Sequence, residues 1–173
     1  IVGVCSVGMT FVIITGGMDL SVGSVIGVSA VAGAMLLSHG VPIPLAFLIV
    51  LLIGAAAGVF NAFFINEIGI APIIMTLGTM TTLRGVAFLL CGGFPVYGIP
   101  EEFLAIGQGY IGIVPVPVII MAVVLILGWY VLNRTRYGRY LYAIGGRGEA
   151  ARLSGINVDK MVVVTYMIAG LLS

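Results

Sequence analysis

The sequence has very few charged side chains for its length. Of its 173 residues, 8% are Asp, Glu, Lys or Arg, whereas 61% are hydrophobic. Soluble domains carry about 25% charged residues, so this chain has too few charges to cover a surface that faces water. The scarcity excludes a water-soluble domain and predicts an integral membrane protein.

The residues that usually build catalytic and metal sites are also scarce. The sequence has one histidine, His39, and two cysteines, Cys5 and Cys91, which lie in or beside apolar runs without metal-ligand spacing. It has no HExxH or GxSxG motif, and the glycine-rich residues 145–148 lack the GK[ST] ending of a phosphate-binding loop. We therefore predict that the chain is not an enzyme and binds no metal, ATP or other cofactor itself.

Long apolar runs dominate the rest of the sequence. A helix needs about 20 apolar residues to cross a hydrocarbon core of about 30 Å, and backbone groups in lipid must be bonded internally. Strand-like alternation is absent, so the runs predict an all-α, polytopic transmembrane bundle of about six spans. Because apolar runs reach both ends of the sequence, we expect the first and last spans to be partial. We also expect residues 1–173 to be a fragment of one membrane domain. The predicted spans are residues 1–15, 22–38, 44–65, 72–91, 116–132 and 161–173.

Two GxxxG patterns predict where helices pack closely. One joins Gly23 to Gly27 in the second span, and the other joins Gly54 to Gly58 in the third. Small residues on one helix face allow two backbones to approach. The pattern indicates packing in a membrane bundle and no particular function.

The distribution of basic residues predicts the orientation of the chain. Six of the seven Lys and Arg residues lie in residues 134–160, and short basic loops stay on the cytoplasmic side. Residues 92–115 contain acidic residues and no base, so we place them outside. Alternation then puts residues 66–71 inside and residues 39–42 outside. The break at residues 16–19 falls at the inner side, or within the membrane if it is re-entrant.

The break between the first two spans carries polar side chains. Its sequence is Gly-Gly-Met-Asp, ending at Asp19, and Ser21 follows. In one interpretation, Asp19 or Ser21 caps the next helix by accepting bonds from its free N–H groups. In the other, the broken helix lines a translocation pathway, where unpaired backbone groups are tolerated. The two interpretations are compatible.

Three further polar residues lie within apolar spans. Arg84 opposes insertion by about 2.5–3.5 kcal/mol if it is central, and an intramembrane charge marks a functional site by default. Alternatively, its side chain snorkels to the outer interface, about two turns away. Asn61 is expected to bond between helices. With Thr79, these residues join Asp19 and Ser21 as candidates for a translocation path or a structural role.

The basic segment of residues 134–160 is too long for a hairpin between adjacent helices. It contains Glu-Ala-Ala-Arg-Leu-Ser-Gly at residues 149–155, a helix-forming stretch ended by glycine. A small amphipathic helix across the inner face fits this pattern. Two roles are open for the segment: an anchor to anionic lipid headgroups, or a docking surface for a cytoplasmic partner.

The same segment also carries a family resemblance. Glu-Ala-Ala at residues 149–151, followed by three residues and Gly155, resembles the EAA loop of ABC-importer permeases. Residues 133–139, 145–146 and 152–156 are similar to the ribose-type monosaccharide permeases, as are residues 16–24 and 72–85. The distal Leu-Pro of longer EAA motifs is absent.

The resemblance implies a permease subunit of an ATP-driven sugar importer, multi-pass in the bacterial inner membrane. It implies several partners: cytoplasmic ATP-binding subunits, which use the ATP, a periplasmic or lipid-anchored sugar-binding protein, and a second permease copy in a homo- or heterodimer. No nucleic acid is expected. Residues 134–160 would be the cytoplasmic coupling loop, with Arg139, Glu149, Ala150, Ala151 and Gly155 as its coupling residues. The alternative is a secondary transporter or channel without ATP coupling.

Overall fold

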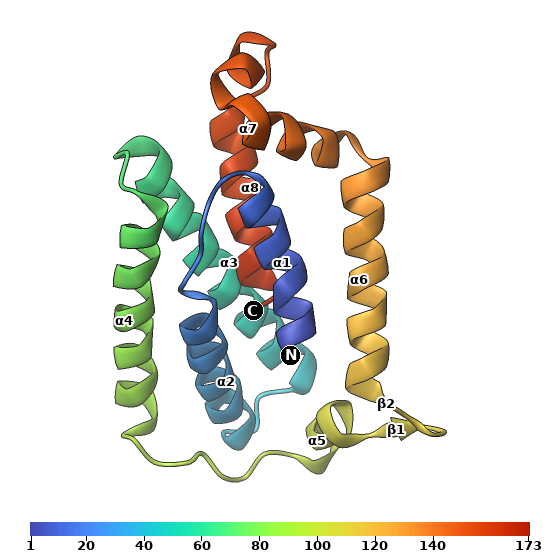
Figure 1. Ribbon diagram of the computed structural model, residues 1–173. Coiled ribbons are helices and arrows are strands. Elements are labelled where there is room, and N and C mark those ends of the chain that lie inside the picture. The colour runs from blue at the N-terminus through green and yellow to red at the C-terminus, as the bar shows by residue number, and fades with distance from the viewer.

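The computed structural model describes the backbone of residues 1–173 and every side chain except that of Ala105. The described chain contains eight helices and one two-stranded hairpin (Figure 1). In chain order they are α1 (Val2–Ile14), α2 (Val22–Ser38), α3 (Ile43–Glu67), α4 (Pro72–Cys91), α5 (Glu101–Gln108), β1 (Tyr110–Ile111), β2 (Val114–Pro115), α6 (Val116–Arg134), α7 (Arg136–Leu153) and α8 (Val158–Leu171).

All six predicted apolar stretches form helices, so the all-α membrane bundle is confirmed. Three helices, α3, α4 and α6, are long and apolar enough to cross a membrane, with 25, 20 and 19 residues. Each of them begins with proline in its first turn, where the missing N–H needs no partner. The helices α1, α2 and α8 are shorter, with 13, 17 and 14 residues.

The connections lie at two opposite ends of the bundle. In Figure 1, residues 66–71 and helix α7 lie at the top, whereas residues 39–42 and 92–115 lie at the bottom. The predicted alternation of the loops is therefore present in the fold. Which end faces the cytoplasm stays a prediction.

The break between α1 and α2 turns back into the bundle. Gly16 adopts φ 80°, a left-handed conformation that favours glycine, and the chain reverses there. Residues 17–21 then run back alongside α1, and α2 begins level with the middle of α1 (Figure 1). Of the two predicted positions for the break, the re-entrant one matches this course.

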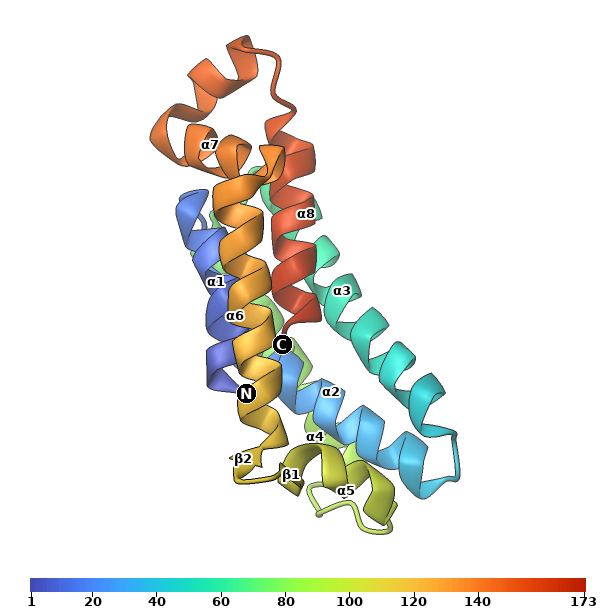
Figure 2. The same cartoon turned by 90° about the vertical axis from the view of Figure 1, so that its right-hand side faces the viewer.

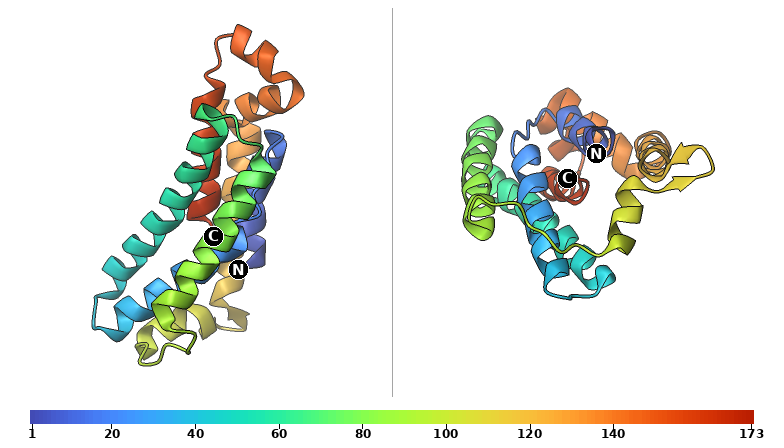
Figure 3. Two further views of the ribbon diagram at one scale, coloured as in Figure 1. Left: turned by 90° about the vertical axis from the view of Figure 1, so that its left-hand side faces the viewer. Right: turned by 90° about the horizontal axis from the view of Figure 1, so that it is seen from below.

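Helix α8 lies at the centre of the bundle when it is seen along its axis (Figure 3). It packs mainly against α3 and α1. A Cβ atom on Gly58 would collide with the Tyr166 carbonyl oxygen, and one on Gly54 with that of Gly170. The second GxxxG pattern therefore makes the close approach that was predicted. The first does not within this chain, because nothing lies within 4 Å of a Cβ placed on Gly23 or Gly27.

Two features of the connection between α4 and α6 were not predicted. Residues 92–115 contain helix α5 and the antiparallel β1–β2 hairpin, in which Tyr110 pairs with Pro115. Glu101 and Glu102 occupy the first turn of α5, where the helix dipole favours negative charge. Both elements are short, so the hydrophobic periodicity used for the long spans could not reveal them.

Candidate functional site

Four of the five candidate path residues meet inside the bundle at the start of α2. Asp19 comes from the break, Ser21 precedes α2, Asn61 lies on α3 and Thr79 on α4. Their exposed fractions are 4%, 0%, 0% and 6%. We call this group the polar junction.

The polar junction is a continuous chain of hydrogen bonds. The Ser21 backbone N–H and hydroxyl both donate to Oδ1 of Asp19, at 2.9 and 2.6 Å. The Asn61 amide donates to the Ser21 hydroxyl at 3.0 Å, and the Thr79 hydroxyl donates to the Asn61 carbonyl at 2.6 Å. The four bonds join three successive pairs of residues along the path from the break to α4. The junction therefore fixes the start of α2 against two neighbouring helices.

The buried polar atoms are well satisfied. Among the described side chains, no buried nitrogen or oxygen atom lacks a hydrogen-bond partner. A buried polar group without a partner destabilises a protein by about 1–3 kcal/mol, and the penalty is larger where water is excluded. The network consequently acts as one unit, in which removal of one member strands its neighbours.

The predicted cap of α2 is wrong for Ser21, whereas Oδ1 of Asp19 does accept the backbone N–H of Ser21, the residue before the helix. Ser21 does occupy the position before the helix, but its side chain accepts no bond from the first turn. Its hydroxyl is instead held between Asp19 and Asn61. The reason is that α3 places an amide donor beside the hydroxyl, so the side chain bonds across helices.

A residue that the sequence did not single out holds the other side of the break. Tyr166 on α8 is 1% exposed, and its hydroxyl donates to the Met18 carbonyl at 3.1 Å. A Cβ atom on Gly17 would lie 2.8 Å from this hydroxyl, so glycine leaves room for the phenol. The only signal in the sequence was a tyrosine within an apolar span.

Arg84 lies apart from the polar junction. Its side chain is exposed on α4 and makes no ion pair within the described chain. It lines a groove of about 510 Å³ between α2 and α4, together with Gly23, Ser24 and Gly27. Arg84 therefore borders this groove and takes no part in the polar junction.

The predicted short helix of the basic segment is part of a longer element. Helix α7 covers Arg136–Leu153 and bends at Arg147, where φ is −152° and ψ is 95°. Its first part crosses the end of the bundle, and the second turns away from it (Figure 2). Leu141 and Ile144 in the first part are buried against the bundle. This packing outweighs the low helix propensity of the glycines that precede the bend.

The second part of α7, residues 148–153, carries most of the predicted coupling residues. Glu149 and Ala150 are exposed, whereas Ala151 is 4% exposed and faces inward. Gly155 adopts φ 83° and ends the helix, with the N–H of Ile156 donating to the Ala151 carbonyl at 3.1 Å. Arg139 is also exposed, but it lies on the first part of α7.

An exposed leucine stands beside these residues and was not predicted. Leu153 is 91% exposed and borders a shallow hollow with Arg147, Glu149 and Ala150. Leu153 is therefore an apolar side chain on an otherwise polar segment that no described residue covers. Exposure depends on how the helix is turned, which the sequence could not show.

Side-chain bonds tie α7 to α8. The Tyr137 hydroxyl donates to the Thr165 hydroxyl at 2.8 Å, because the Thr165 hydrogen is directed to the Met161 carbonyl. Burial raises the pKa of Tyr137 above its usual value, so it stays protonated at neutral pH. At the other end of α7, Arg152 forms an ion pair with Asp159, the one ion pair among the described side chains.

A family of known proteins matches this chain over residues 1–173. Its description is branched-chain amino acid transport system / permease component. The chain belongs to this permease family. No solved structure matches the permease.

The curated relatives include sugar importers. The permease is 41% identical to the ribose import permease protein RbsC of Haemophilus influenzae over 98% of its own length, and 42% identical to that of Bacillus subtilis over 99%. It is 36% identical to the autoinducer 2 import system permease protein LsrD of an Enterobacter species over 99%. It spans 54% of each of these relatives. The resemblance to ribose-type permeases is confirmed.

Proposed function

We propose that this chain is part of the membrane-spanning subunit of an ATP-driven importer of ribose-like monosaccharides. The subunit would be multi-pass in the bacterial inner membrane, with α7 in the cytoplasm. It would work with cytoplasmic ATP-binding subunits, a sugar-binding protein outside and a second permease copy. The chain would do no chemistry itself, since ATP would be bound and hydrolysed by the partner subunit.

The observation that carries this proposal is the course of α7 and α8. One turn of α8 contains both Thr165, which bonds to Tyr137 of α7, and Tyr166, which bonds to Met18 of the break. Met18 adjoins Asp19, the first member of the polar junction. A continuous set of contacts therefore links the end of the bundle to the start of α2.

The mechanism follows from this linkage. The ATP-binding subunits would hold α7 at Glu149 and Leu153, and closure of these subunits would move α7 as a rigid lever. The motion would pass to α8 through Tyr137 and the Arg152–Asp159 ion pair. Because packed elements switch between discrete arrangements, α8 and the start of α2 would shift together and change the access of the pathway.

The candidate path residues divide into two roles in this proposal. The side chains of the polar junction bond to one another, so we assign them the positioning of the broken helix. Arg84 lines the groove between α2 and α4, and its guanidinium group can donate bonds to sugar hydroxyls. We therefore assign Arg84 to the path itself.

The proposal is tested with the full-length permease, assembled with its ATP-binding subunits and reconstituted in vesicles. Uptake of labelled ribose should require ATP and should be lost in Glu149→Arg and in Gly155→Trp, the second of which forces a bulky residue into a left-handed conformation. Uptake that an ion gradient drives without ATP would instead identify a secondary transporter. Full uptake in both variants would refute the coupling role of the second part of α7.

A further inference from the structure

Three arginines gather at the junction of α6 and α7 without acidic partners. Arg134 ends α6, and Arg136 and Arg139 lie in the first turns of α7; we call these three residues the basic elbow. All three are exposed and none forms an ion pair with a described side chain. The sequence has no acidic residue between Glu102 and Glu149. The positive charge of the elbow is therefore not neutralised within this part of the chain.

Local bonds hold the basic elbow in a fixed shape. The Thr135 hydroxyl donates to the Val131 carbonyl at 2.6 Å and accepts from the Gly138 N–H at 3.3 Å. A Cβ atom on Gly138 would collide with the Leu132 carbonyl, so the two helices approach closely at this corner. Within the first turns of α7, Leu141 is fully buried while the arginines are exposed. Their side chains consequently extend away from the bundle.

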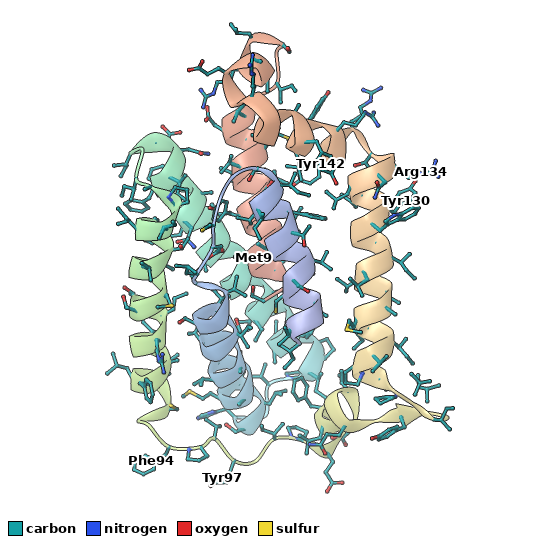
Figure 4. The ribbon with its side chains drawn as sticks, viewed as in Figure 1. Met9, Phe94, Tyr97, Tyr130, Arg134 and Tyr142 are labelled. Carbon is teal, nitrogen blue, oxygen red and sulfur yellow. The ribbon has the colours of Figure 1, made fainter. Side chains whose placement is uncertain are left out.

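The side chains of α6 change in character toward the basic elbow, in the order in which a membrane leaflet changes from acyl chains to headgroups. Ile126 and Leu127 of α6 are 64% and 57% exposed, as expected for a lipid-facing helix. Trp129 and Tyr130, one turn further on, are 57% and 54% exposed, and Tyr130 projects outward close to Arg134 (Figure 4). Indole and phenol rings prefer the level of the headgroups. Apolar, aromatic and basic side chains thus succeed one another along residues 126–139.

We propose that the basic elbow binds the headgroup phosphates of anionic phospholipids in the leaflet that the α6–α7 corner meets. Arginine suits this ligand because its planar guanidinium group donates two parallel bonds to phosphate oxygens. The basic segment then has two surfaces: the elbow for lipid, and residues 148–153 for the ATP-binding subunits. This division places Arg139, which the resemblance put among the coupling residues, on the lipid surface. The inference rests on the membrane embedding of α6 in the proposed function, and it does not require coupling to ATP.

The test uses the fluorescence of Trp129 in the assembled transporter. The full-length protein is reconstituted in two sets of phosphatidylcholine nanodiscs. One set contains phosphatidylglycerol with brominated acyl chains, and the other contains phosphatidylcholine with brominated acyl chains. The brominated lipid has the same mole fraction in both sets. Subtraction of the Trp129→Phe signal isolates the quenching of this tryptophan, the only one in the chain. We expect brominated phosphatidylglycerol to quench Trp129 more strongly than brominated phosphatidylcholine.

Removing the charges should remove this preference step by step. An arginine near an anionic surface contributes about a fivefold preference, so each Arg→Gln change in the elbow should reduce the preference by about that factor. Lys160→Gln removes an exposed charge from the same segment, away from the elbow, and should leave the preference unchanged. A triple Arg→Lys variant should retain most of it, and salt of about 1 M should weaken it by screening.

Two kinds of result would overturn the inference. The first concerns the lipid: equal quenching by both brominated lipids in the unchanged protein, or a phosphatidylglycerol preference that survives the triple Arg→Gln change. The other concerns a protein partner: loss of the ATP-binding subunits from the triple variant in detergent, without anionic lipid, would show that the elbow contacts protein. Retained ribose uptake in the lipid-insensitive variant would leave the proposed transport function intact.

Discussion

The polar junction and the second part of α7 differ in the surroundings of their side chains: those of the junction are buried and hydrogen-bonded, whereas most of those in the second part of α7 are exposed. In the junction, Asp19, Ser21 and Asn61 lie out of contact with solvent and bond to one another. In residues 148–153, Glu149 and Leu153 project outward, and Leu153 is covered by nothing in the described chain. The difference teaches that the junction is a complete structural unit, whereas the end of α7 leaves its side chains without partners in the described chain, as the docking role proposed above requires.

Asn61→Leu should break the junction and have the largest effect. It removes the donor to Ser21 and the acceptor of Thr79, which leaves two buried hydroxyl groups with fewer partners. We expect a loss of about 2–6 kcal/mol in the free energy of unfolding, at 1–3 kcal/mol for each hydroxyl that loses a buried partner. Thermal unfolding of the purified full-length protein measures this loss of stability. Asn133→Leu, at an exposed position on α6, is the control; equal destabilisation by both changes would refute the role of the junction.

Leu153→Asp should weaken assembly and leave the fold intact. A side chain that anchors an interface contributes about 2 kcal/mol or more, so affinity for the ATP-binding subunits should fall at least about 30-fold, as measured by co-purification or by titration in nanodiscs. The matched control is Ile113→Asp, because Ile113 is 95% exposed at the opposite end of the bundle. A similar loss of affinity in both variants would argue against docking at Leu153.

Tyr166→Phe should loosen the link between α8 and the break. It removes the hydroxyl that donates to the Met18 carbonyl, and we expect a loss of about 0.5–1.5 kcal/mol in stability. If the link transmits motion, sugar uptake per ATP hydrolysed should also fall. Tyr137→Phe, which removes the bond to Thr165, should reduce the same ratio. An unchanged ratio in both variants would show that motion travels by another route.

The Arg152–Asp159 ion pair should contribute least. Its side chains are 58% and 47% exposed, and exposed ion pairs contribute about 0–1 kcal/mol. Asp159→Asn should therefore change the unfolding temperature by little, and the small effect should disappear at high salt. A loss as large as that of Asn61→Leu would mean that α7 is held to the bundle mainly by this pair.

The polar junction also shows which features of the candidate site could be predicted from the sequence and which could not. The sequence revealed Asp19, Ser21, Asn61 and Thr79 as candidates one by one, and the fold brought all four together. It grouped Arg84 with them, although Arg84 faces another groove. Thr79 and Arg84 both lie on α4, five positions apart, so their side chains leave the helix about 140° apart around its axis. Their separation could be seen only once the faces of α4 were known.

The sequence by itself determined the class of the molecule, its six apolar helices, the alternation of its connections and its family. These follow from the length of apolar runs and the position of charges, which are local properties that set how each segment partitions between lipid and water. The tertiary structure alone decided that α2 starts inside the bundle, that α7 extends back to Arg136, and that Ala151 turns inward while Leu153 turns out. Such features depend on how helices rotate and pack against one another, and no single segment of sequence contains that information.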